Sequence, residues 1–483
     1  MEARYRYVLD CFRSIYGVPD DVVIAYGDDP EGAPVTIRRS GTTFFDGDAP
    51  RPAPPPVWRS WHNRQIPFLF DVDDGEPVLS VSEGRAVIHY DLLASAFYFL
   101  SGWQEHVYMR RYAALRYPWR ESLQHHLDIT GVPVVNYYFD ILRHAVEQAC
   151  SIRLVPGTVH GGHAFTICLT HDIDALHSGW TYDTAYCLRR RRPRALARVL
   201  FHRLRGRDTW DNLDAILAME KEREAVSSFY FIARYGRVYQ NDAFDRFTDR
   251  EPPLRDGHGP GADFFFREAP APGYSRMQRN ADYRMRDRDL REGMERLHRG
   301  GAEIGIHGSF GSHVDLERLW GEVQRFPAPV RGGRFHFLNF DHSRTLDILE
   351  ELGFHYDSTL GFAEQPGFRN GTAYPFFPWN FREERPYRVL EIPLVLMDTT
   401  LRSYTGTPKD EIPARIDALM AETRRFGGCL TVLWHNSFFS GYKYAGWKTL
   451  YGYLLEQGYT QGAWMTSAER VSLHWRNLLR PRG

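Results

Sequence analysis

Short apolar segments alternate with amphipathic segments from Phe165 onward, and this alternation limits the possible folds more than any other feature of the sequence. The apolar segments predict buried strands at 165–169, 227–233, 303–307, 330–338, 389–396, 429–434 and 463–466. The amphipathic segments predict helices at 212–224, 288–299, 316–326, 343–352, 409–426, 447–457 and 468–479. Repeated strand–helix units favour a parallel sheet, either open or closed into a barrel.

Residues 1–156 lack this alternation, and we expect them to form a first unit of their own. Its predicted helices are 5–16, 91–105 and 132–149. The glycine-containing stretch 157–162 predicts a linker. We therefore expect a smaller α+β domain over 1–156, without a recognisable catalytic constellation, and an α/β domain over 163–483.

The composition is typical of a globular protein, with 43% apolar and 25% charged residues. A formal net charge of −1 gives no general attraction to nucleic acid, and none is expected as a partner. No secretory h-region follows Met1, and no apolar stretch approaches the ~18 residues of a spanning helix. Five scattered cysteines, an odd number, argue against a disulfide framework and a thiolate zinc site. A cytoplasmic location is expected.

Polar residues gather where several predicted strands end. His171, Asp172 and Asp174 follow the strand at 165–169. Two carboxylates one residue apart suit one metal ligand and one general base, although an Asx-rich turn would also account for the pair. Later segments carry further candidates: His307, His313, Arg334, His336, Asp357 and His435. Because ligands of α/β folds bind outside the carboxyl ends of the strands, this convergence predicts one functional site.

Five motifs, in this order, resemble the polysaccharide deacetylases with NodB homology (carbohydrate esterase family 4). They are Leu-Thr-His-Asp-Ile-Asp (169–174), Ser-Ser-Phe-Tyr-Phe (227–231), Glu-Ile-Gly-Ile-His-Gly-Ser-Phe (303–310), Gly-Arg-Phe-His (333–336) and Leu-Trp-His-Asn (433–436). The segments 356–362 and 367–372 are similar to the subgroup with an extra N-terminal domain. The resemblance implies a deformed (β/α) barrel, a divalent metal ion, zinc, and an N-acetylated glycan or amino-sugar substrate.

The resemblance also implies roles for individual residues. Asp172 matches the general base, and Arg334 matches the arginine that orients it. Asp174 and His307 match metal ligands, and His435 matches the general acid.

Two roles follow the family pattern less directly. Ile173 separates two aspartates that are adjacent in the commoner pattern, as in a known variant. For the acid that orients His435 we expect Asp357, with Asp398 as the alternative.

The third metal ligand is where this sequence departs from its family. The usual His-x-x-x-His spacing after His307 falls on Gly311, which has no side chain to donate. We expect His313 to be the ligand, because Gly308 and Gly311 make the intervening loop pliable. His336, near the end of a neighbouring strand, is the alternative.

We therefore expect a metal-dependent hydrolase that removes N-acetyl groups from an amino sugar or polysaccharide, in cell-surface polysaccharide metabolism. One alternative is a hydrolase of another non-peptide C–N bond on the same fold. The other is a catalytically inactive glycan-binding or assembly protein.

Three further segments are candidates for contacts with substrate or membrane. Residues 189–207 carry nine arginines among apolar residues, which predicts a solvated helix face, a peripheral membrane contact or a contact with an anionic glycan. Aromatic residues in 436–447 predict a wall for sugar stacking or ordinary packing. Residues 367–378, rich in aromatics, Gly and Pro, are expected to form a loop over the mouth of the site.

Overall fold

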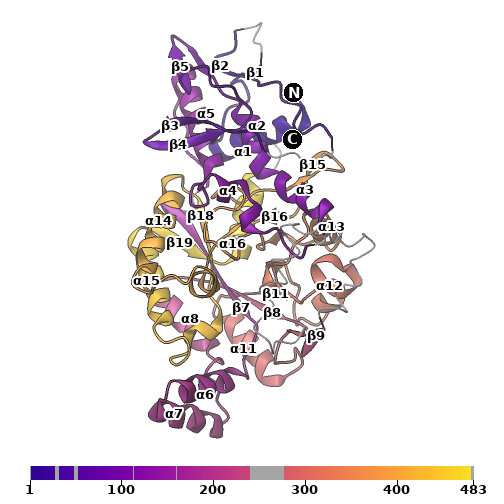
Figure 1. Cartoon of the computed structure of the whole chain (residues 1–483), viewed down its shortest axis with the longest axis vertical. Helices are drawn as coiled ribbons and strands as arrows, with labels where there is room; N and C mark the ends of the chain where they lie inside the picture. The colour runs from indigo at the N-terminus through magenta and orange to yellow at the C-terminus, as the bar shows by residue number, and fades with distance from the viewer. Residues whose placement is uncertain are drawn as a thin grey trace.

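The computed structural model describes residues 2–27, 32–47, 53–112, 114–158, 160–239 and 277–479. The chain forms a smaller N-terminal unit stacked on a larger α/β unit, and the two ends of the chain lie near each other at the N-terminal unit (Figure 1). Within the described residues, no helix is both long enough and apolar enough to cross a membrane.

The N-terminal unit is built on a four-stranded sheet with a separate hairpin. The sheet order is β1 (Ile24–Tyr26), β2 (Val35–Ile37), β6 (Arg85–Ile88) and β5 (Leu79–Ser82). The hairpin pairs β3 (Val57–Trp61) with β4 (Arg64–Phe68). The helices are α1 (Ala3–Tyr16), α2 (Leu92–Leu100), α3 (Trp103–Arg111), α4 (Leu123–His126) and α5 (Val134–Cys150). The helix predicted over 91–105 is split between α2 and α3, because Gly102 adopts a left-handed conformation with φ 67°.

The larger unit is organised around one nine-stranded parallel sheet. Its order is β16 (Leu390–Glu391), β13 (Tyr356–Asp357), β12 (Gly332–Phe335), β11 (Glu303–Gly308), β8 (Ser228–Ile232), β7 (Phe165–Ile173), β18 (Cys429–Leu433) and β17 (Leu394–Met397). β19 (Ala463–Thr466) pairs with the first half of β7. Two short antiparallel pairs lie outside it: β9 (Arg237–Tyr239) with β10 (Met277–Arg279), and β14 (Trp379–Asn380) with β15 (Arg385–Pro386).

The two edges of this sheet are consecutive pieces of one segment. The strand predicted over 389–396 is interrupted at Ile392 and Pro393, and Pro393 has no N–H to donate to a ladder. β16 before the break pairs with β13, whereas β17 after it pairs with β18. The sheet therefore curls round on itself, which confirms the predicted barrel-type fold with parallel strands.

Helices cover the outside of the curled sheet (Figure 1). They are α8 (Leu213–Lys221), α11 (Arg288–Arg299), α12 (Leu316–Val323), α13 (His342–Glu351), α14 (Ile412–Arg425), α15 (Trp447–Thr460) and α16 (Ala468–Leu478). Two further helices, α6 (Gly179–Arg189) and α7 (Pro193–Leu204), project from one end of the barrel instead (Figure 1). α11 shows the amphipathic rule, because it buries Leu290, Met294 and Leu297 on one face and exposes its arginines on the other. β7 and β8 are buried along their whole length, which explains why apolar residues predominate in both, although β7 also carries His171 and Asp172 near its end.

Residues 367–378 are buried between the two units, so the expectation of a loop over the site mouth is wrong. The backbone N–H of Phe368 donates to Thr130 O at 2.8 Å, and that of Val135 donates to Gly371 O at 2.8 Å. Arg369 makes a two-point ion pair with Glu105 of α3, with both distances 2.7 Å. The aromatic and glycine content of this segment therefore serves the packing of the first unit on the barrel.

Candidate active site

The strand ends of the barrel converge on a pocket of about 610 Å³. Its lining includes Asp172, Asp174, His307 and His435, which stand at or just beyond the carboxyl ends of β7, β11 and β18. His171 points away from the pocket, because successive strand residues face opposite sides. It is fully buried, and its ring nitrogens bond to Trp434 O at 2.6 Å and to a Glu220 oxygen at 2.8 Å.

Three side chains in the pocket have the spacing of metal ligands. Asp174 Oδ1 lies 3.4 Å from His307 Nε2 and 3.3 Å from His336 Nδ1. The two imidazole nitrogens are 3.0 Å apart. Ligands at 2.0–2.1 Å from a tetrahedral zinc ion lie about 3.3 Å from one another. Asp174 is partly open to the pocket, but its Oδ1 is shielded from solvent and has no hydrogen-bond partner among the residues that the structure describes, so this donor set fits a divalent cation.

The protonation pattern of the group also suits a cation. His307 Nδ1 lies 2.9 Å from Arg334 O, so the tautomer that donates there leaves the Nε2 lone pair facing Asp174. Burial lowers the pKa of His307, but the charges of Asp172 and Asp174 raise it further, and the net shift is upward. Burial raises the pKa of Asp174, but His336, His307 and His435 lower it by more, well below its ordinary value. A carboxylate that stays ionised beside two imidazoles is a ready metal ligand.

Asp172 is held separately from this group by an arginine. Arg334 Nη1 donates to Asp172 Oδ1 at 3.0 Å, and both side chains are almost fully buried. The guanidinium also donates to Thr170 Oγ1 at 2.8 Å and to Ser358 O at 2.6 Å. Burial lowers the pKa of Arg334, but Asp172 raises it further, so the guanidinium stays charged. Asp172 Oδ2 faces the three residues with metal-ligand spacing, Asp174, His307 and His336 (the metal-fitting group), and lies 3.6 Å from His307 Nε2.

His435 lies on the other side of Asp174 and is oriented by Asp398. His435 Nδ1 lies 2.8 Å from Asp398 Oδ1, and the backbone N–H of His435 donates to Asp398 Oδ2 at 2.6 Å. His435 Nε2 is left 3.8 Å from Asp174 Oδ2. Burial lowers the pKa of His435, but Asp398, Asp174 and Asp172 raise it to about 10. The imidazole is therefore protonated near neutral pH.

The expectation that Asp357 orients His435 is wrong, and the alternative, Asp398, makes the contact. Asp357 accepts hydrogen bonds from Thr359 N and Thr359 Oγ1, both at 2.9 Å. The reason is the sheet order, because β13 lies between β12 and β16, whereas β17, which ends just before Asp398, pairs directly with β18.

His313 is also not where it was expected, because His336 takes its place in the metal-fitting group. After Gly311, which has φ 87°, the chain turns into a short 3-10 helix over Ser312–Val314. His313 is buried there with its ring centroid 6.2 Å from that of Phe335. Burial, with Arg318 and Arg344, lowers the pKa of His313 to about 3. His336 reaches the site because it follows β12, which pairs with β11.

The pocket walls are aromatic and come from several segments. Phe438, Lys443 and Tyr444 line the pocket, so the segment 436–447 does contribute a wall, with the Phe438 and Tyr444 rings stacked at 4.3 Å. Tyr182 and Trp210 form a second stacked pair in the lining, at 5.0 Å. Sequence patterns alone did not single out Tyr182 or Trp210.

The N-terminal unit also reaches the pocket lining, through Arg116. Arg116 Nη1 donates to Phe337 O at 2.8 Å, and its Nη2 lies 3.2 Å from a Glu364 oxygen. No motif of the sequence pointed to this residue. The first unit is therefore part of the pocket wall.

The N-terminal part of the chain matches a protein-family model. Residues 3–151 match the model of a family of unknown function, DUF7033. No curated protein matches the sequence.

Several solved structures resemble 66% of the chain. A protein from Mycobacterium smegmatis named as a polysaccharide deacetylase is 17% identical, with a TM-score of 0.37 and 92% of that chain covered. A probable polysaccharide deacetylase from Pseudomonas aeruginosa PAO1 is 11% identical, with a TM-score of 0.40 and 94% covered. Puue allantoinase is 12% identical, with a TM-score of 0.39 and 93% covered.

Proposed function

We propose that this chain is a metal-dependent hydrolase that removes N-acetyl groups from an amino sugar or polysaccharide, in cell-surface polysaccharide metabolism. The observation that carries the proposal is that a metal-fitting group and a separate, arginine-held carboxylate share one pocket. The stacked aromatic walls suit the apolar faces of sugar rings. The ordered motifs at the strand ends, which resemble the polysaccharide deacetylases, support the same reaction class.

In this proposal Asp174, His307 and His336 hold the divalent cation, zinc. When bound, the cation supplies Lewis-acid polarisation of the amide carbonyl. Asp172 acts as the general base and accepts a proton from water as the water oxygen attacks the carbonyl carbon. Arg334 keeps Asp172 in position and favours its ionised form, because an adjacent cation stabilises a carboxylate.

His435 acts as the general acid in the same mechanism. When the carbonyl C–N bond breaks, the amine nitrogen needs a proton, because an amide anion is a very poor leaving group. His435 carries that proton on Nε2 while Asp398 binds its Nδ1. The new C–O bond and the broken C–N bond give acetate and a free amino sugar.

The test is acetate release from a panel of N-acetylated glycans and of lipid-linked and nucleotide-linked amino sugars, with and without a chelator. We expect release from at least one substrate, and loss of release with chelator that zinc restores. Release of ammonia or opening of a cyclic amide without acetate would favour the hydrolase of another C–N bond. Binding of a glycan without any turnover would favour the inactive binding protein.

We also propose that α6 and α7 contact an anionic membrane surface on the cytoplasmic side. The two helices project from the barrel at the end opposite the N-terminal unit (Figure 1). Four large apolar side chains are solvent-exposed there: Leu188 (60%), Leu200 (41%), Phe201 (50%) and Leu204 (87%). Residues 189–207 contain nine arginines and no acidic residue. Each basic residue near an anionic surface contributes about 1 kcal/mol to the free energy of binding. The exposed apolar and basic side chains of α6 and α7 therefore fit a lipid surface better than a purely solvated face.

The membrane contact would lie close to the pocket, because Ser178 and Tyr182, at the start of α6, line the pocket. Replacing Arg191, Arg194, Arg198 and Arg203 by Gln should reduce co-sedimentation with phosphatidylserine vesicles by about tenfold or more. A matched control replaces the four arginines of α11 (Arg288, Arg291, Arg296 and Arg299) and should change nothing. Equal sedimentation of all three proteins, or none by the parent, would leave only the solvated-face interpretation.

A further inference from the structure

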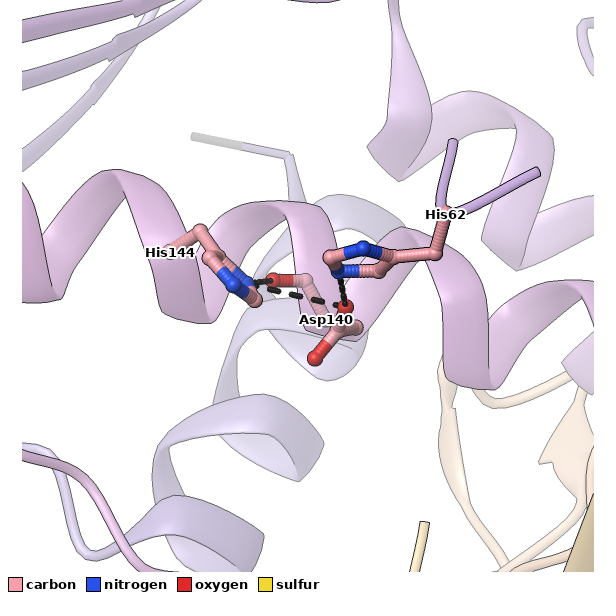
Figure 2. A group of neighbouring side chains, drawn as sticks. All are labelled: His62, Asp140 and His144. Carbon is pink, nitrogen blue, oxygen red and sulfur yellow. Dashed lines mark hydrogen bonds and ion pairs between the residues drawn. The ribbon is translucent and has the colours of Figure 1, made fainter. Parts of the chain in front are cut away.

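A second group of metal-ligating side chains lies in the N-terminal unit, outside the candidate active site. It consists of His62, Asp140 and His144, whose ligand atoms all lie within 4.8 Å of one another (Figure 2). We infer that this group, the hairpin cluster, binds a zinc-like transition-metal ion and thereby ties the β3–β4 hairpin to α5. The inference is independent of the proposed function, because it concerns a different unit and a different ion.

The fold brings the three side chains together from two elements. Asp140 and His144 are four residues apart on α5, so they lie one turn apart on the same helix face. His62 comes from the two-residue turn of the hairpin, between the paired residues Trp61 and Arg64. His62 has φ 46° and the next residue, Asn63, has φ 63°, which is the left-handed geometry of a tight hairpin turn. This turn directs the His62 ring toward Asp140 (Figure 2).

The distances fit a single ion. His62 Nε2 lies 3.2 Å from Asp140 Oδ2, and His144 Nδ1 lies 3.6 Å from the same oxygen. His144 Nδ1 also lies 2.9 Å from Asp140 O and 3.2 Å from Arg143 Nη2, contacts that an ion bound to this nitrogen would replace. These values bracket the separation of about 3.3 Å between ligands of a tetrahedral zinc ion. Two imidazoles with one carboxylate suit zinc and its late first-row neighbours better than calcium or magnesium, which prefer oxygen ligands throughout.

Neighbouring side chains fix the carboxylate of the cluster. Trp61 Nε1 donates to Asp140 Oδ2 at 2.9 Å, and Arg143 Nη2 donates to Asp140 Oδ1 at 2.7 Å. Hydrogen bonds of this kind orient a ligand carboxylate in a metal site. They leave Oδ2 on the side of the two histidines.

The local charge also favours a cation, despite the presence of Arg143. Arg143 Nη1 makes an ion pair with Glu147 at 2.8 Å, so its positive charge is shared between two carboxylates. With neutral histidines, Asp140, Glu147 and Arg143 sum to one negative charge. His62 is 47% exposed and His144 28% exposed, so an ion bound there keeps open positions for water.

The experiment measures bound zinc per chain after equilibrium dialysis of the full-length protein. We expect two ions in the parent and one in both His62→Ala and His144→Ala, with acetate release unchanged. His126→Ala removes an exposed histidine of the same unit as a matched control and should keep two ions. In an Asp174→Ala background, zinc should still raise the melting temperature, and adding His144→Ala should abolish that shift, because an ion that binds only the folded state stabilises it.

The two metal sites can fail separately in this design. One ion per chain that is lost with Asp174→Ala and kept with His144→Ala would overturn the hairpin-cluster inference and leave the proposed function standing. One ion that is lost with His144→Ala and kept with Asp174→Ala would support the hairpin cluster and count against the proposed function. A second ion that persists in both histidine variants would also overturn the inference.

Discussion

The metal-fitting group of the barrel (Asp174, His307 and His336), called the barrel group from here on, offers the same ligand types as the hairpin cluster, two imidazoles and one carboxylate. They differ in the groups that surround the ligands. In the described part of the barrel, Asp174 Oδ1 has no hydrogen-bond partner, and the arginine binds a different carboxylate, Asp172. In the hairpin cluster, the arginine binds the ligand carboxylate itself.

This difference separates a site that could use an ion from one that could only hold it. A hydrolase of this kind needs one carboxylate for the metal and another for the proton of water. The barrel supplies both, and its Asp172 and Asp174 project to the same side because they are two residues apart in an extended chain. Beside the hairpin cluster, the second acid among the described residues is Glu147, whose carboxylate is occupied by Arg143 and by the N–H of Leu154.

Replacing the second carboxylate of the barrel tests this distinction with the largest expected effect. Asp172→Asn should lower kcat for acetate release by roughly 10²- to 10⁴-fold, the usual contribution of a general base. An amide cannot accept the proton from water, but it can still accept the hydrogen bond from Arg334. Bound zinc should stay at the parent value, as measured by dialysis beside the rate assay.

The control for this variant is stability, because Asn leaves a buried guanidinium without its counter-charge. The loss of rate can be attributed to the missing base only if the melting temperature of Asp172→Asn lies above the assay temperature, so that the protein assayed is fully folded. Near-parental acetate release by folded Asp172→Asn would show that the second carboxylate is not the base and would remove the main contrast between the two groups.

The second prediction compares His336 with His313, the two histidines that the sequence left open. His336→Ala should weaken zinc binding at the barrel group by about 100-fold and reduce acetate release with it, because it removes one of three ligands. His313→Ala should leave bound zinc unchanged, since that ring is packed near Phe335. Loss of zinc with His313→Ala and retention with His336→Ala would contradict the geometry of the pocket.

Much of the fold could be predicted from the sequence, because periodicity is a local property. The strands β7, β8, β11 and β18 are short segments rich in apolar residues, and the amphipathic helices that follow them repeat at helical spacing. The break at Pro393 was missed because Val389–Glu391 and Leu394–Met397 read as one apolar run. The curvature of the sheet, which the sequence does not show, makes β16 pair with β13 and β17 pair with β18.

The candidate site could be predicted only in part, because some of its residues follow strands directly and others are placed by tertiary structure. Asp172, Asp174, His307, Arg334 and His435 stand at strand ends, and parallel strands bring their ends to one edge. Their catalytic and metal-binding roles remain predictions. The partner of His435 and the third ligand depend on strand order and on the turn at Gly311, which are tertiary properties. Arg116 and the two histidines of the hairpin cluster depend on how distant segments pack.

The third prediction concerns the pH dependence of acetate release, which tests the role of His435 beside the barrel group. The pKa of His435 is raised to about 10 because Asp398, Asp174 and Asp172 outweigh burial. In Asp398→Asn the largest of the raising contributions is gone, so the pKa of His435 should fall. Acetate release needs the protonated imidazole, so the high-pH limb of the kcat/KM profile should move to lower pH.

Rates measured across neutral to alkaline pH check this shift, with zinc content measured in the same samples. Zinc content should not change, because Asp398 is not part of the barrel group. A high-pH limb that stays in place or moves upward would mean that His435 is not the acid that protonates the amine.

The smallest expected effect comes from Glu147, which touches no proposed ligand of the hairpin cluster. Glu147→Gln removes one negative charge and leaves Arg143 to act on Asp140 alone. Both changes oppose a bound cation, so zinc affinity at the hairpin cluster should fall by about three- to tenfold, or ~1 kcal/mol for a partly exposed charge. The loss should shrink at high ionic strength, because salt screens exposed charges. The barrel group should be unaffected, and Glu83→Gln, at an exposed position of the same unit, is the matched control. Unchanged or tighter zinc binding in Glu147→Gln at low salt would show that the balance of charge around Arg143 does not hold the ion.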